Sequence, residues 1–211
     1  MGEPREPLVP VGAADAALIT HLHPDHFDAA TLRECIGDGV VLCPLGTEEK
    51  VAAEGLTARG VGVWEQVDAA GFACTAVPAV DGLGDAQVSW VVADAGHRLI
   101  HCGDTLWHGS WWRIAARTGP FAAAFVCING ARVRFPGLEP SGIEADLTPE
   151  QAIAAAGVLG AELVIPIHYG TFDNPPVYEE TADAEGRFRA AAEARGVEAR
   201  LLSPGTELGL R

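Results

Sequence analysis

The sequence predicts one domain of mixed α/β (α+β) class. Short apolar runs that are typical of buried strands alternate along the chain with segments of helical pattern. A length of 211 residues suits one sizeable hydrophobic core, and neither an internal repeat nor a linker interrupts the chain. We therefore predict that residues 1–211 form a single domain.

The expected strands are short and mostly apolar, with turn-forming residues between them. They cover residues 16–20, 40–43, 60–64, 71–77, 88–93, 98–102, 123–128 and 163–167, and a final segment at 199–202 closes the domain. Helices are expected at residues 29–36, 47–53, 111–117, 148–160 and 187–195. The clearest helix start is at Thr148, because Pro149 suits the first helical position and Gln151 completes a capping box.

Composition excludes several classes of function. The net charge of −15 argues against a nucleic-acid surface, which needs clustered Lys and Arg. Apolar runs stay far below the ~20 residues of a membrane span, and residues 1–5 lead into Pro-rich sequence rather than a signal peptide. The five Cys are scattered and form no CxxC pattern, so we expect free thiols and a cytoplasmic protein.

Four side chains that can bind metal ions lie within His21-Leu22-His23-Pro24-Asp25-His26, directly after an apolar run. His21 and His23 are two residues apart, so in an extended backbone they point to the same side. Asp25 and His26 follow the turn at Pro24 and can reach a second point nearby. Imidazole and carboxylate together suit Zn²⁺, Mn²⁺ or Fe²⁺, so this segment predicts a metal centre.

Three motifs in this order resemble those of the metallo-β-lactamase superfamily. The H-x-H-x-D-H segment resembles its metal motif, and Ile100-His101-Cys102-Gly103-Asp104-Thr105 is similar to its strand ending in a metal-bridging Asp. Ile165-Pro166-Ile167-His168-Tyr169-Gly170-Thr171-Phe172 is similar to the strand ending in its last His ligand. The resemblance runs over residues 15–206. It is greatest to the branch that contains ascorbate-6-phosphate lactonase and N-acyl-phosphatidylethanolamine phospholipase D.

The resemblance implies an αβ/βα sandwich, and the chain departs from the family pattern in two places. Family members open with strands before the first motif, whereas this chain has only residues 1–15 there, so these N-terminal strands are missing or shortened. The family's third His is also absent: residues 75–82 offer Asp81 instead. A carboxylate in that place shifts the metal preference toward harder ions.

The resemblance also implies the ligands of one or two divalent ions (Zn, Mn or Fe). The first ion would take His21, His23 and Asp81. The second would take Asp25, His26 and His168, and Asp104 would bridge the two. Asp81 can equally be a turn residue before Gly82, which leaves Asp85, His101 and His108 as other candidates.

A second feature follows Asp104 in Trp107-His108-Gly109-Ser110-Trp111-Trp112. His108 is the best acid/base or oxyanion-stabilising residue outside the ligand set, so the predicted catalytic residues are Asp25, Asp104 and His108. The three Trp either form an apolar wall for a substrate or pack into the core. Asn129 and Tyr169 are weaker pocket candidates. Arg132 and Arg134 either bind an anionic group such as phosphate or carboxylate or, as we favour, lie on the surface.

These features predict a metal-dependent hydrolase that uses a metal-bound hydroxide on a small-molecule substrate. A lactone or ester is the first choice, a phosphodiester the second. The alternative is a metal-binding protein of the same fold that has lost catalysis. Because shortened opening strands would leave an edge strand bare, we also expect either a homodimer or a substitute strand at residues 8–11.

Overall fold

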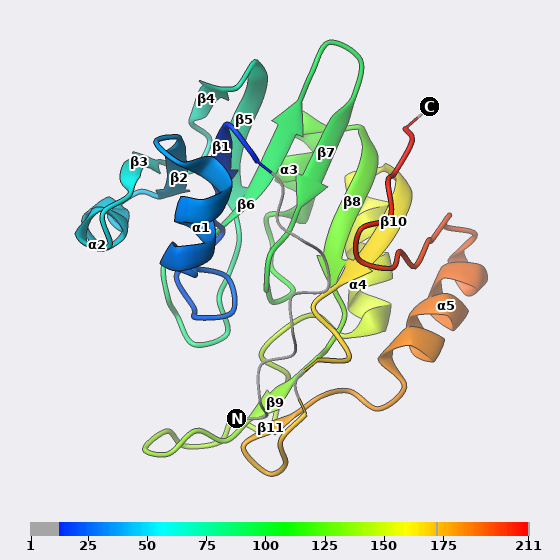
Figure 1. Ribbon diagram of the computed structural model, residues 1–211. Helices are drawn as coiled ribbons and strands as arrows, with labels where there is room; N and C mark the ends of the chain where they lie inside the picture. The colour runs from blue at the N-terminus through cyan, green and yellow to red at the C-terminus, as the bar shows by residue number, and fades with distance from the viewer. Residues whose placement is uncertain (1–12, 172, 211) are drawn as a thin grey trace.

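The computed structural model describes residues 13–171 and 173–210, and Figure 1 shows two sheets with helices on their outer sides. The smaller sheet holds three parallel strands in the order β1-β2-β3. Its strands are β1 (Ala16–Leu18), β2 (Val40–Pro44) and β3 (Thr57–Val61), and α1 (Ala29–Ile36) and α2 (Glu48–Ala53) connect them. No strand precedes Ala16 among the described residues, and the proposed substitute strand at 8–11 lies outside them.

The larger sheet holds six strands in the order β10-β8-β7-β6-β5-β4. They are β4 (Gln66–Ala69), β5 (Phe72–Pro78), β6 (Val88–Ala93), β7 (Arg98–His101), β8 (Phe121–Cys127) and β10 (Ala161–Ile167). The helices α3 (Trp111–Thr118), α4 (Pro149–Leu159) and α5 (Ala184–Arg195) lie on its outer side. A short antiparallel pair, β9 (Arg132–Val133) and β11 (Tyr178–Glu179), lies beyond the sheet.

Alternation along β2 explains the layering. Val41 and Cys43 pack against α1 and α2, whereas Leu42 faces the space between the sheets, where it meets Val88 and Trp90 of β6. Successive side chains of a strand point to opposite faces, so β2 supplies both interfaces at once. The predicted αβ/βα sandwich is therefore confirmed.

The outer face of the larger sheet is covered mainly by α4. Thr148 caps this helix as predicted: its hydroxyl accepts the N–H of Gln151 at 3.3 Å, and the Gln151 side chain accepts the N–H of Thr148 at 3.0 Å. Pro149 takes the first helical position, and the helix ends at Gly160 in the left-handed region. The apolar face of α4 then packs on β8 and β10.

The segment at residues 199–202, which was expected to close the domain, does not form a regular strand. Only Ala199 forms a bridge, to Val164, and the rest of the C-terminal segment runs without regular pairing. Leu202, Leu208 and Leu210 cover the inner face of β8 and β10. The three strands of the smaller sheet cannot cover all six of the larger sheet, so irregular chain packs on that face instead.

Other boundaries also differ from the prediction. The strand expected at 60–64 ends at Val61, because residues 62–65 turn and Trp64 adopts a positive φ of 72°. β4 was not predicted, although its buried Val67 and Ala69 alternate with exposed residues. α5 starts at Ala184 rather than residue 187, since the Asp183 carboxylate caps it. None of the helices in the described residues is both long and apolar enough to cross a membrane.

Candidate metal centre

Four strands that carry the predicted ligands end near one another. β7 is parallel to β8, which is parallel to β10, and β5 runs in the same direction because two antiparallel steps separate it from β7. Their carboxyl ends therefore share one edge of the larger sheet. β5 leads to Asp81, β7 to Asp104 and β10 to His168, while β1 leads to the segment from His21 to His26.

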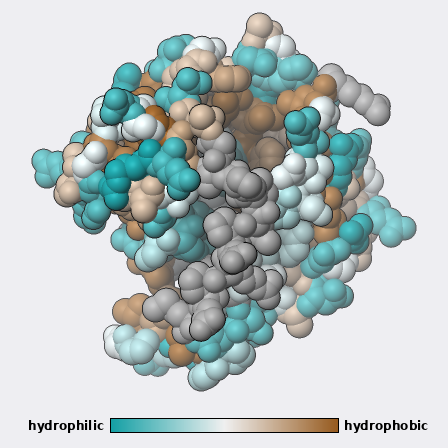
Figure 2. All heavy atoms as spheres, viewed as in Figure 1, coloured by the Kyte–Doolittle hydropathy of each residue, from teal (hydrophilic) through white to brown (hydrophobic). Residues whose placement is uncertain are grey.

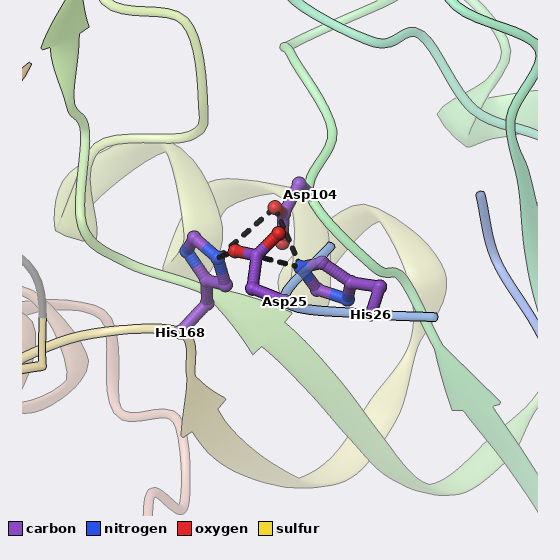
Figure 3. A group of neighbouring side chains, drawn as sticks. All are labelled: Asp25, His26, Asp104 and His168. Atoms are coloured by element: carbon purple, nitrogen blue, oxygen red, sulfur yellow. Dashed lines mark hydrogen bonds and ion pairs between the residues drawn. The ribbon is translucent and has the colours of Figure 1, made fainter. Parts of the chain in front are cut away.

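Asp25, His26, Asp104 and His168 form one compact group, and Figure 3 shows their side chains pointing toward a common centre. Asp104 Oδ2 lies 2.9 Å from His26 Nε2 and 3.0 Å from His168 Nε2. Asp25 Oδ2 lies 3.2 Å from His168 Nε2 and 3.6 Å from His26 Nε2. Ligand atoms about 2.1 Å from one tetrahedral ion would be ~3.4 Å apart, so this spacing fits a metal ion.

Unpartnered polar atoms support the same fit. His21 Nε2, His26 Nε2 and Asp104 Oδ1 are buried and have no hydrogen bond of acceptable geometry. His26 Nε2 lacks one even though Asp104 Oδ2 is only 2.9 Å away. Buried polar atoms without partners are rare in folded proteins. These three atoms face a common centre without forming hydrogen bonds to one another, and ligand atoms around a metal ion have this arrangement.

His21, His23 and Asp81 form a second group, and their ligand atoms lie within 4.8 Å of one another. His23 Nδ1 is 3.9 Å from Asp81 Oδ2, and His21 Nε2 is 4.0 Å from Asp104 Oδ2. The Asp104 carboxylate therefore lies between the two groups. All seven predicted ligands are brought together, in the two sets expected from the sequence, and their binding of metal stays a prediction.

The loop at residues 81–85 orients both Asp81 and His23. Asp81 Oδ1 accepts the backbone N–H groups of Leu83 at 2.7 Å and Asp85 at 3.1 Å, which leaves Oδ2 to face His23. Asp85 Oδ2 contacts His23 Nε2 at 3.0 Å, on the ring edge opposite to Asp81. Metal-binding His residues commonly donate their second N–H to a carboxylate in this way. We therefore predict that Asp85 supports His23 and does not itself bind an ion.

Burial keeps the ring of His21 neutral. It is fully buried, and burial, with the nearby charge of His26, lowers its pKa to about 4. The ring is neutral at physiological pH, and Nδ1 bonds the Thr20 hydroxyl at 3.0 Å. If Nδ1 carries the proton in that bond, the lone pair of Nε2 is directed at the centre.

His168 is in the opposite state. Burial alone would lower its pKa, but the hydrogen bond to Asp25 and the carboxylates of Asp104 and Asp146 raise it to about 9. Burial would likewise raise the pKa of the Asp25 carboxyl, yet its contact with His168 and the charge of His26 hold it well below its usual range. The carboxylates of Asp25 and Asp104 thus stabilise a positive charge on His168.

Close packing fixes the position of Asp104. Gly103 adopts a positive φ of 63°, and a Cβ there would lie 3.0 Å from the Thr20 side chain. The Gln87 side chain donates to the Asp104 carbonyl, and Thr105 Oγ1 accepts the N–H of Val80 at 3.0 Å. These contacts join the ends of β5 and β7 to the segment that carries His21.

Comparison with known proteins agrees with this geometry. The family model described as a beta-lactamase superfamily domain matches residues 2–169, most of the chain. The chain belongs to this superfamily. With its converging His and Asp ligands, it is a metal-dependent hydrolase of the metallo-β-lactamase fold.

Three of the similar proteins illustrate the relationship. A UPF0173 metal-dependent hydrolase of Rubrobacter xylanophilus is 31% identical and aligns with 97% of this chain and 82% of its own length. The metallo hydrolase Igni18 of Ignicoccus hospitalis is 22% identical, with a TM-score of 0.71 over 92% of this chain and 78% of its own. CmlA, a diiron β-hydroxylase of Streptomyces venezuelae, shares the fold at 15% identity, with a TM-score of 0.73 over 92% of this chain and 44% of its own.

His108 belongs to neither of the two ligand groups. Its ring stacks on Trp111 at 4.3 Å, Nδ1 accepts the N–H of Ser110 at 3.1 Å, and burial lowers its pKa to about 4. Trp111 is fully buried and belongs to the core, whereas Trp107 and Trp112 are exposed. An apolar wall can therefore involve Trp107 and Trp112, and the catalytic role of His108 stays a prediction.

A small open cleft lies beside His168. Its described lining residues are Asn129, His168, Tyr169, Thr171, Tyr178 and Glu180. Asn129 Nδ2 donates to Asp146 Oδ2 at 2.9 Å and to the Tyr178 hydroxyl at 2.6 Å. The sequence indicated Asn129 and Tyr169 but missed Asp146 and Tyr178, because neither belongs to a motif or a periodic segment.

The Asp85→Asn variant tests the support of His23. Loss of the carboxylate should weaken metal binding at the His21, His23 and Asp81 group by roughly 10- to 100-fold, because the ring is no longer held and polarised. Metal titration followed by elemental analysis measures this. Asp94→Asn is the matched control, since Asp94 contacts His97 at 3.7 Å on the exposed turn between β6 and β7. Unchanged affinity in the Asp85 variant would contradict the assigned role.

Asp146 should make stability depend on pH. Burial and the charge of Asp104 raise its pKa from 3.8 to about 6, so the fold favours the neutral acid. The stability that the neutral Asp146 carboxyl contributes to the fold is fully present below about pH 4, and it is lost as the pH rises through 6. Asp146→Asn should therefore gain stability over the wild type between pH 4 and pH 7.5, by up to about 3 kcal/mol. Urea unfolding of the metal-free proteins measures the difference, and a constant difference across this range would refute it.

Proposed function

We propose that this protein hydrolyses a lactone or ester of a small molecule at a two-metal centre. The observation that carries the proposal is the meeting of two ligand groups at the Asp104 carboxylate, 2.9 Å from His26 and 4.0 Å from His21. Two divalent ions in such a centre activate water and polarise a carbonyl oxygen. No Ser or Cys nucleophile is required.

The roles of the side chains follow from their positions. His21, His23 and Asp81 would hold one ion, while Asp25, His26 and His168 would hold the other, with Asp104 shared. Asp25 is the more exposed acid of this group, with 34% of its side chain accessible, so its second carboxylate oxygen, Oδ1, would be suited to accept the proton that the attacking water releases. Cys102 is fully buried and lies outside both ligand groups, so no role in metal binding is assigned to it.

The charges near the cleft favour a neutral carbonyl substrate over a phosphodiester. No Lys or Arg is among the described lining residues, and Glu180 adds a carboxylate. Arg132 pairs with Glu144 at 2.9 Å and Arg187 pairs with Glu150 at 2.7 Å, so both are engaged elsewhere. An anionic substrate would therefore find no basic side chain in the described lining of this cleft. A phosphodiester therefore remains the second choice.

The carboxylate of Asp81 favours Mn²⁺ or Fe²⁺ at the first position more than a third His would, because it is the harder ligand. A neighbour of the same fold, CmlA, is described as a diiron enzyme, so the fold can hold iron. Zn²⁺ stays an alternative.

Asp81→His tests this preference. The ratio of Zn²⁺ to Mn²⁺ affinity should rise relative to the wild type, because imidazole replaces carboxylate. Competitive dialysis with elemental analysis measures the ratio, and an unchanged ratio would count against Asp81 as a ligand. A metal-loaded structure with the Asp81 oxygens well beyond ~2.2 Å from any ion would refute the assignment directly.

A panel of lactones, carboxylic esters and phosphodiesters tests the function. Metal-loaded wild type should hydrolyse a lactone or ester fastest, and Asp104→Ala should lose both metal and turnover because the shared ligand is gone. Asp68→Ala, on the exposed side of β4, is the control for replacing an acid. Full metal occupancy without turnover on any substrate would instead support a metal-binding protein that has lost catalysis.

Two further properties stay predictions. All five Cys are free, which fits a reducing compartment, and we therefore propose a cytoplasmic location and small molecules rather than nucleic acids as partners. Homodimer formation also remains a proposal. Within the described residues β1 pairs only with β2, and light scattering at low concentration would detect a dimer.

A further inference from the structure

The cleft beside His168 contains polar groups that the metal centre does not use. Asn129 is only 2% exposed, and its Oδ1 has no partner. Its Nδ2 donates both of its hydrogens, one to Asp146 Oδ2 and one to the Tyr178 hydroxyl. Because the nitrogen faces two oxygens, the orientation of this amide follows from its network.

This network decides the direction in which Tyr178 donates. The hydroxyl oxygen already accepts a hydrogen bond from Asn129 at 2.6 Å. Its own hydrogen therefore points elsewhere, and within residues 13–171 and 173–210 the hydroxyl donates to no group of the chain. Tyr178 and His168 line the same cleft, so this donor is next to the metal centre.

The backbone around Tyr178 is held from two sides. Tyr178 pairs with Val133 in the β9–β11 pair, and it also bridges to Asn174, whose N–H bonds its carbonyl at 2.8 Å. Thr181 donates to the carbonyl of Asn129 at 2.8 Å, so both residues of the network are joined through main chain as well. A donor held in this way needs little ordering when a ligand binds.

We propose that Tyr178 is a substrate-binding residue whose hydroxyl donates a hydrogen bond to a carbonyl oxygen of the substrate, and that Asn129, anchored by Asp146, positions it. The substrate class rests on the proposed function, whereas the donor itself rests on the Asn129–Tyr178 contact. Asn129 is a positioning residue, since it acts through Tyr178. Its Oδ1 is buried and has no partner.

Tyr178→Phe is the direct test, because it removes only the hydroxyl. In the metal-loaded protein, kcat/KM for γ- and δ-lactones should fall roughly 10- to 100-fold, as for loss of one hydrogen bond to a group that gains charge. The Kd of the matching lactam, which keeps the ring carbonyl, should rise in calorimetric titration. Thr118→Val is the control: it removes a hydroxyl that bonds Ile114 in α3, at the opposite edge of the sheet.

Asn129→Ala tests positioning through a double-mutant cycle. It should lower kcat/KM by a similar factor, and the Asn129→Ala/Tyr178→Phe protein should lose no more than either single variant. Additive losses would show that Asn129 does not act through Tyr178. Metal content and melting temperature of each variant separate this effect from a structural one, and a metal loss in Tyr178→Phe would overturn the binding role.

The two readouts distinguish this inference from the proposed function. An active wild type with an equally active Tyr178→Phe protein and unchanged lactam affinity overturns the inference alone. A wild type that hydrolyses no lactone or ester, but binds lactam more tightly than Tyr178→Phe does, overturns the function and supports the donor. If the wild type neither binds lactam nor hydrolyses a lactone, both are refuted.

Discussion

The buried carboxylate of Asp104 is the constraint on which the site depends. It is 6% exposed, and a carboxylate in that position is costly unless positive charge and hydrogen-bond donors surround it. His168, whose pKa is raised to about 9, supplies positive charge beside it, and the rings of His21 and His26 lie around the same carboxylate. These residues come from two sheets, so the sandwich must bring the ends of β1, β7 and β10 together for the charge to be compensated.

Much of the metal centre could be predicted because its signals are local. Four ligands lie within six residues after β1, and Asp104 and His168 directly follow strands. The residues that hold these ligands in place were harder to predict from the sequence. The contact between His23 and Asp85 spans 62 positions, and that between Asn129 and Tyr178 spans 49. Only the folded chain brings such pairs together, and no periodicity in the sequence marks them.

The errors in the predicted fold have a related cause. β4 has only four residues, too few for its alternation to be distinguished from the turn before it. The segment at 199–202 pairs with β10 only through Ala199, while Leu201 packs against the core that contains α4 and Leu202 packs on the inner face of β8 and β10. What decided its conformation was the unequal size of the two sheets, which is a tertiary property that local propensity does not contain.

The charge of the centre also links the metals to the cleft. In the metal-free chain His168 has a pKa of about 9, so its proton supplies positive charge beside Asp25 and Asp104. A metal ion that binds there must displace that proton, since a ligating imidazole is neutral. The ion then brings more positive charge than it removes, and nearby positive charge favours the ionised form of Asp146. The ionised carboxylate accepts from Asn129 Nδ2, and the same nitrogen donates to the Tyr178 hydroxyl. The charge at the metal centre therefore acts on the carboxylate that anchors Asn129.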